Sequence, residues 1–188
     1  MKKLSLGLVL LLAASVAFSA AQTATGKRFE LGTSISYYNI KFDDDEGGSI
    51  SYLNIPVRFG FYIWNGLEFE PEFQLFVPMG EDSGDTTYFV TGKLLYNFEL
   101  GGGFSPFIGG GAGIGNGIPF LGIIEGGTDY KSFAFMGVLG FKYMIGNTAA
   151  LRVEYRFNRF NWETPWLLEG EKEWATLHNI LVGVSIFF

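Results

Sequence analysis

The amino-acid sequence predicts an all-β protein: an eight-stranded antiparallel up-and-down transmembrane β-barrel, preceded by a cleaved signal peptide. Eight segments of the 188-residue chain alternate apolar and polar residues, and the connections between them alternate in length. Alternation with a period of two is typical of strands that have one apolar face. No apolar run after the leader reaches the roughly 20 residues that a membrane helix needs. The 27 Gly and 20 Phe also suit strands packed in a small barrel better than a soluble helical domain.

The N-terminal residues predict a secretory signal peptide at 1–21 and a single barrel domain at 22–188. Met1-Lys2-Lys3 is basic, an apolar run from Leu4 to Phe18 follows, and Ser19-Ala20-Ala21 offers small residues for cleavage after Ala21 or Ser19. A membrane anchor is the alternative, but the apolar run is too short for a spanning helix. The chain contains no cysteine, so neither a lipoprotein anchor nor a disulfide is expected.

The first three predicted strands run from Phe29 to Tyr38, from Ile50 to Trp64 and from Leu67 to Val77. The third is the clearest, because apolar residues at its odd positions alternate with Glu and Gln at its even positions. Asn65-Gly66 separates the second and third strands and is a strong signal for a tight hairpin.

Two prolines lie inside these strands, Pro56 in the second and Pro71 in the third. A proline has no backbone N–H to donate to a neighbouring strand, and a closed barrel has no free edge where that loss is harmless. We therefore expect a β-bulge at one or both prolines.

The next three strands are expected at Tyr88–Phe98, Pro106–Gly115 and Phe133–Ile145. The fourth carries Lys93 on its polar face, and the sixth carries Lys142 opposite large apolar residues. The fifth is so rich in glycine that alternation does not indicate which of its residues face inward.

The last two strands are expected at Ala149–Phe160 and His178–Phe188. The seventh alternates Arg152, Glu154 and Arg156 with apolar residues, and the eighth has a uniformly apolar face that ends on Phe188. The long connections lie near 41–49, 80–87, 116–132 and 161–175, and the short ones at 65–66, 99–103 and 146–148. A membrane barrel has this arrangement, with long external loops and short periplasmic turns.

Alternation alone is compatible with a soluble, lipocalin-like barrel whose apolar face points inward. Three features favour the membrane barrel. The apolar face has no charge in mid-strand, aromatic residues gather near strand ends, and the polar face carries as many acids as bases. The predicted interior charge network consists of Glu30, Arg58, Glu68, Glu70, Glu72, Lys93, Lys142, Arg152, Glu154 and Arg156. A static ion-paired core is one interpretation, because eight strands enclose just enough space for side chains. A gated conduit with Arg152, Arg156 and Glu72 as a movable latch is the other.

Two segments resemble stretches that are common in small outer-membrane β-barrels: Pro106 to Gly115 and Leu139-Gly140-Phe141-Lys142-Tyr143. The ending Gly183-x-x-Ile186-x-Phe188 is similar to the signal that the barrel-assembly machinery recognises in that family, which includes the OmpA transmembrane domain and the OmpX and OmpW types. The resemblance implies a monomer in the bacterial outer membrane, in contact with membrane lipid and lipopolysaccharide. It also implies a transient partner, the assembly machinery, that recognises Gly183, Ile186 and Phe188.

The connections carry the remaining candidate interaction residues. Asp43, Asp44 and Asp45 form an acidic tip that either binds divalent ions or is a solvated turn. Trp162, Trp166 and Trp174 make the last connection apolar, and they either contact a surface partner or extend the interfacial aromatic belt. His178 is the only histidine, and alternation places it on the lipid-facing side.

The sequence therefore favours a non-enzymatic protein, without a cofactor, whose external loops carry a structural or surface-interaction role. One alternative is a narrow channel for small hydrophobic compounds, as the OmpW resemblance implies. A lipid A-modifying enzyme that uses His178 is the other. The net charge of −6 argues against nucleic acid as a partner.

Overall fold

A computed structural model describes residues 27–41, 49–79, 86–116, 131–163 and 172–188. These residues include no helix long and apolar enough to span a membrane. They form eight strands: β1 (Phe29–Lys41), β2 (Ser49–Trp64), β3 (Leu67–Met79), β4 (Thr87–Asn97), β5 (Phe104–Asn116), β6 (Lys131–Ile145), β7 (Ala149–Glu163) and β8 (Lys172–Phe187). The predicted leader at 1–21 and the acidic tip at Asp43, Asp44 and Asp45 lie outside the described residues.

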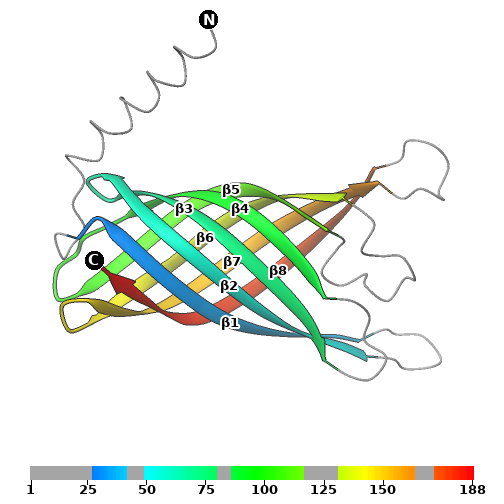
Figure 1. Cartoon of the computed structure of the whole chain (residues 1–188), viewed down its shortest axis with the longest axis horizontal. Coiled ribbons are helices and arrows are strands. Elements are labelled where there is room, and N and C mark those ends of the chain that lie inside the picture. The colour runs from blue at the N-terminus through cyan, green and yellow to red at the C-terminus, as the bar shows by residue number, and fades with distance from the viewer. Residues whose placement is uncertain (1–26, 42–48, 80–85, 117–130, 164–171) are drawn as a thin grey trace, which may run out of the picture.

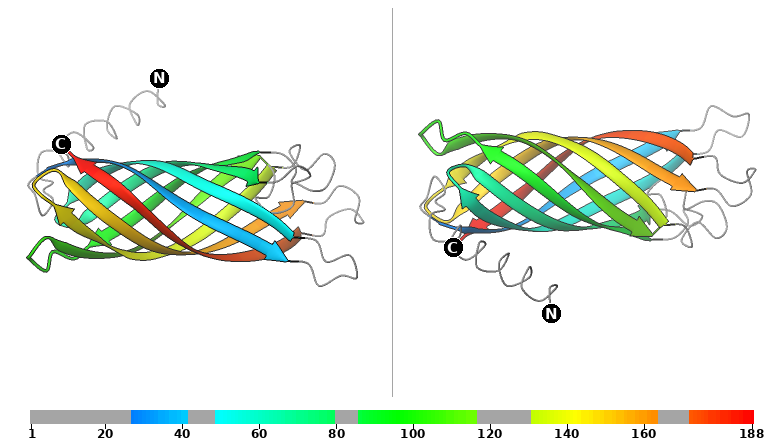
Figure 2. Two further views of the ribbon diagram at one scale, coloured as in Figure 1. Left: turned by 90° about the horizontal axis from the view of Figure 1, so that it is seen from below. Right: turned by 90° about the horizontal axis from the view of Figure 1, so that it is seen from above.

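Each strand pairs antiparallel with the next, and β8 pairs with β1 to close the barrel (Figure 1). The strands tilt around the barrel axis, and the C-terminus lies at the end that holds the short turns (Figure 2). The predicted fold class, a closed eight-stranded antiparallel barrel, is confirmed. Several predicted boundaries were too short: β1 extends to Lys41 and β7 to Glu163, and β8 begins at Lys172. Trp162 and Trp174 therefore lie in strands rather than in a connection.

The two faces of the sheet differ as the alternation predicted. On β3, Glu72 is 2% exposed while its neighbour Phe73 is 45% exposed. The same contrast holds for Glu30 and Leu31 on β1 and recurs around the barrel. The outward face is therefore predominantly apolar and most charged side chains of the strands face the interior, which is the arrangement of a barrel surrounded by hydrocarbon.

The expectation of a bulge at Pro56 or Pro71 was wrong. Pro56 pairs with Gln74 and Pro71 with Gly92, and the register is the same on both sides of each proline. The irregularity in register lies instead between Tyr62 and Trp64, beside the Asn65-Gly66 turn. Only Gly66 in this turn has a positive φ, 75°. A type I′ turn needs positive φ at both central residues, so the hairpin is closed with a bulge instead.

The glycines of β5 face the interior at positions 109, 111, 113 and 115, while Ile108 and Ile114 face outward. A Cβ atom added at Gly111 would lie 2.7 Å from Lys93 Cγ, and one added at Gly115 would lie 2.7 Å from the ring of Phe89. The added Cβ atoms would also contact the backbone oxygens of Gly92 and Tyr88, so the glycines leave room for both the backbone and the large inward side chains of β4. The space that β4 occupies therefore decides which residues of β5 face inward, a question that alternation left open.

The β1–β8 seam is paired only in the part nearer the short turns, from Glu30 opposite Phe187 to Ile35 opposite Val182. Beyond this point both strands continue toward the long-connection end, β1 to Lys41 and β8 back to Lys172, without pairing to each other. Figure 1 shows the consequence, since the blue end of β1 and the red-orange end of β8 lie apart at that end.

Candidate functional site

All ten residues of the predicted charge network lie inside the barrel, each at most 2% exposed. They come from β1 (Glu30), β2 (Arg58), β3 (Glu68, Glu70, Glu72), β4 (Lys93), β6 (Lys142) and β7 (Arg152, Glu154, Arg156). Alternation on each strand points them to the axis, where they meet across the lumen. We call these ten residues the ion-pair layer.

The part of the layer nearer the long connections is built around Glu72 and Glu154. Arg156 donates from its two terminal nitrogens to the two oxygens of Glu72, both at 2.6 Å, and its Nε contacts Glu154. Arg58 donates to Glu154 at 3.0 Å, and Lys93 Nζ lies 2.8 Å from Glu72. Both carboxylates are therefore shared by several cations. Such charge-assisted, bidentate contacts are among the stronger hydrogen bonds in proteins.

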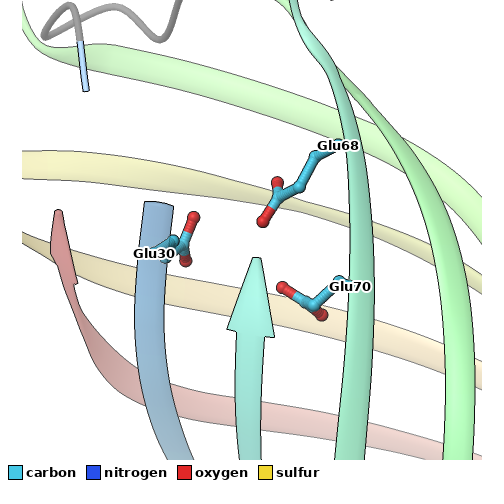
Figure 3. Close-up of side chains that lie close together, drawn as sticks. All are labelled: Glu30, Glu68 and Glu70. Atoms are coloured by element: carbon cyan, nitrogen blue, oxygen red, sulfur yellow. The ribbon is translucent and has the colours of Figure 1, made fainter. Parts of the chain in front are cut away.

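Three carboxylates converge in the part of the layer nearer the short turns: Glu30, Glu68 and Glu70 (Figure 3). One oxygen of each lies within 4.8 Å of the others, which is a spacing that a metal ion can bridge. Lys142 contacts Glu30 and Glu68, however, and Arg152 contacts Glu30 and Glu70. Each of the three carboxylates therefore already has a protein cation as its counterion.

Charge is balanced over the whole layer but not within each part. Glu30, Glu68 and Glu70 face two cations, Lys142 and Arg152, while Glu72 and Glu154 face three, Arg58, Lys93 and Arg156. Two contacts connect the parts, Lys93 to Glu70 at 2.6 Å and Arg152 to Glu154 at 2.6 Å. The five acids and five bases thus form one continuous network rather than separate pairs.

Apolar side chains border the layer on three sides. Tyr62, Ala150, Phe187 and Met144 pack together at the short-turn end. Phe76, Phe89, Ala134 and Phe160 pack together toward the long connections, with Tyr38 and Leu177 against them; we call this group the aromatic cluster. Leu95, Phe107, Met136 and Val138 line the wall formed by β4, β5 and β6. The charges are therefore enclosed by hydrocarbon, where only paired charges are tolerated.

Sequence reasoning missed the neutral partners of the layer. Tyr62 Oη donates to Glu30 at 3.0 Å, and Asn97 Nδ2 donates to Glu68 at 2.9 Å. Ser185 on β8 donates to the other oxygen of Glu30. All three lie on the inward phase of their strands, so alternation would have placed them in the lumen. It would not have shown which charge each one contacts.

The other candidate residues lie on or near the outward face. Trp174 and Ile186 are exposed on β8, and Phe188, which follows this strand, is exposed too. Gly183 faces inward against Ser34. His178 is exposed, and its Nδ1 lies 2.6 Å from Tyr155 Oη. The barrel wall separates this pair from the ion-pair layer. The backbone of Trp162 belongs to β7, and Trp166 lies outside the described residues.

Comparison with known proteins shows the family of the chain. A search of curated proteins found no match. Among solved structures, the fold is similar to Neisserial surface protein A, with a TM-score of 0.59 at 14% identity over 85% of this chain and 96% of that one. It is also similar to the N-terminal barrel of Pseudomonas aeruginosa OprF, with a TM-score of 0.52 at 12% identity over 86% and 98% of the two chains.

A de novo designed transmembrane β-barrel is similar too, with a TM-score of 0.52 at 9% identity over 89% of this chain and 99% of the design. Such likenesses establish the fold alone. The model of the outer membrane protein beta-barrel domain matches residues 7–188, nearly the whole sequence. This family indicates a location in the bacterial outer membrane. The chain therefore belongs to the family of outer membrane protein beta-barrel domains.

Proposed function

We propose that this protein is a non-conducting outer-membrane barrel that acts as a rigid anchor, with a structural or surface-interaction role carried by its external connections. The ion-pair layer is the observation that carries this proposal. Its ten charges are paired and at most 2% exposed, and an eight-stranded barrel leaves little lumen beyond its own side chains.

Opening a path through the layer would separate buried charges from their partners. Removing one partner of a buried pair typically costs about 3–5 kcal/mol, and several pairs would have to separate together. Glu154 alone contacts Arg58, Arg152 and Arg156. Moving one arginine as a latch would therefore also change the contacts that the other arginines make with the same carboxylate. This connectivity supports a static core over a gate.

Conductance in planar bilayers tests the closed interior. The mature wild-type barrel is expected to give no steady current, either with salt alone or with small hydrophobic solutes added. A steady, solute-dependent current would overturn the proposal. The interaction role needs a second measurement, the binding of the purified barrel to a panel of immobilised surface glycoproteins. Replacing residues 42–48, 80–85, 117–130 or 164–171 with Gly-Ser segments of equal length is expected to abolish binding. Binding that survives replacement of all four would contradict it.

A second candidate function, uptake of small hydrophobic compounds, is favoured by the incomplete β1–β8 seam. The unpaired part of this seam lies on the same side of the ion-pair layer as the aromatic cluster, whose Leu177 belongs to β8 and Tyr38 to β1. A hydrophobic compound that enters there would reach the bilayer sideways without crossing the charges.

Cross-linking the seam tests this second candidate, and the natural absence of cysteine makes the experiment clean. If the ladder continued, Tyr37 would lie opposite Ile180, so a Tyr37→Cys/Ile180→Cys pair would lock the seam when oxidised. Thr33→Cys/Val184→Cys is the matched control, because these residues already pair. Uptake of a hydrophobic fluorescent dye by vesicles should stop only with the first pair oxidised. Equal uptake with either pair oxidised, or no uptake by the reduced protein, would reject this candidate.

A further inference from the structure

Arg159 is the one charged side chain on the outward face of the strands among the side chains that the structure describes. Its guanidinium carbon lies 4.8 Å from the centre of the Trp174 ring on β8. Trp174 in turn stacks against Phe135 on β6, with ring centres 6.4 Å apart and planes inclined by 14°. Three adjacent strands thus place a cation beside two aromatic rings. No ion pair links Arg159 to any described carboxylate.

The position of Arg159 along β7 gives its depth in the membrane. Arg159 lies ten positions after Ala149, which is at the short-turn end. At about 3.3 Å per residue and a tilt of about 40°, this distance is roughly 25 Å along the barrel axis, which equals the height of the apolar band of such barrels. The outward residues between them, Leu151, Val153, Tyr155 and Phe157, carry no charge. Arg159 therefore lies at the headgroup level of the external leaflet.

The chemistry of this position fits an anion. A guanidinium facing hydrocarbon would be costly, whereas at the headgroup level it reaches water and lipid phosphates. The ring of Trp174 lies against the guanidinium, a cation–π contact that holds the side chain in place. The N–H groups at the edge of the guanidinium point in its own plane and suit two oxygens of one phosphate. Trp is also a common residue at membrane interfaces.

We propose that Arg159 and Trp174 form a binding site for a phosphate group of a phosphorylated glycolipid in the external leaflet, lipid A being the form to test. The site goes beyond the proposed anchoring function and does not depend on the connections or on the lumen. Charge complementarity and depth carry the proposal, because Arg159, which has no ion-pair partner among the described side chains, faces the negatively charged phosphates of the leaflet. Phe135 stacks with the Trp174 ring, which in turn contacts Arg159.

Native mass spectrometry of the detergent-solubilised full barrel tests the site, with bisphosphorylated lipid A, enzymatically dephosphorylated lipid A and phosphatidylglycerol as separate probes. Wild-type protein is expected to retain bisphosphorylated lipid A at least about tenfold better than the dephosphorylated form, the effect of one charge-assisted hydrogen-bonded contact. Arg159→Gln is expected to abolish this preference, and Arg159→Lys to keep part of it. Trp174→Leu should weaken it.

Thr176→Val is the matched control. Thr176 pairs with Arg159 on the same outward face, and its replacement by valine removes no charge. This variant should bind as the wild type does. Circular dichroism of each variant shows whether the barrel has folded. Equal retention of the two lipid A forms by wild-type protein, or unchanged preference in Arg159→Gln, would overturn the site. Stronger retention of phosphatidylglycerol than of lipid A would overturn the choice of glycolipid.

Discussion

Arg156 on β7 holds both carboxylate oxygens of Glu72 on β3, at 2.6 Å each, across the full width of the barrel. The two strands lie opposite each other in the ring of eight, so this contact ties together walls that share no backbone hydrogen bonds. The ion-pair layer therefore connects opposite walls of the barrel as well as filling its lumen.

Removing the charge of Glu72 should destabilise the barrel more than removing that of Glu68. Glu72→Gln removes the charge of a carboxylate that contacts Arg58, Lys93 and Arg156, and is expected to cost about 3–5 kcal/mol of unfolding free energy. Glu68 shares Lys142 with Glu30, and its Oε1 has no hydrogen-bond partner among the described residues. Glu68→Gln should therefore cost less. Urea unfolding in lipid vesicles measures both, and the reverse order would contradict the contacts described here.

A charge placed on the outward face at mid-strand should be as harmful as one removed from the interior. Phe73→Arg puts a guanidinium on an outward position of β3 and is expected to cost roughly 2–4 kcal/mol. Phe73→Leu is the matched control and should cost much less, since it stays apolar. The same vesicle-based unfolding measurement applies. If Phe73→Arg were neutral, the outward face would not contact hydrocarbon.

Glycines of β5 should resist substitution where the lumen is full. Gly111→Ala places a methyl group against the backbone oxygen of Gly92 and 2.7 Å from Lys93 Cγ, and is expected to cost about 1–3 kcal/mol through overpacking. Gly137→Ala on β6 is the control, because a Cβ atom there has no other atom within 4 Å. Thermal unfolding of the two variants compares them directly. Equal melting temperatures would show that β4 and β5 do not pack as closely as the structure indicates.

The His178–Tyr155 pair is expected to have no role in lipid modification. It lies on the outward face, apart from the ionised groups of the interior, with Phe157 packed edge-on against the imidazole. Lipid A extracted from cells that carry the wild type, His178→Ala or no copy of the protein should have identical masses. A mass change that appears with the wild type and disappears with His178→Ala would reveal an enzyme.

Much of the fold follows from local patterns. The number of strands, the inward direction of Glu70 and Arg152, and the outward direction of Phe73 and Ile186 can all be predicted from alternation. This works because successive side chains of a strand point to opposite faces, and a charge on the lipid-facing side destabilises the barrel. The predicted ends of strands were less accurate, as β8 shows by beginning at Lys172.

Which side chains meet within the lumen depends on how the eight strands are staggered around the ring. The sequence pattern of a single strand carries no information about this stagger. Thus the sequence alone determined that Glu72 and Arg156 face inward, and only the closed barrel decided that they meet. The phase of β5 was decided in the same way, since glycine has no side chain to show polarity and the bulk of Lys93 and Phe89 on β4 sets the space. The bulge beside Trp64 depends on the register between strands in the same way, and so does the unpaired part of the β1–β8 seam near the long connections. Side-chain direction is a property of each residue in its strand, whereas contact requires the positions of two strands at once.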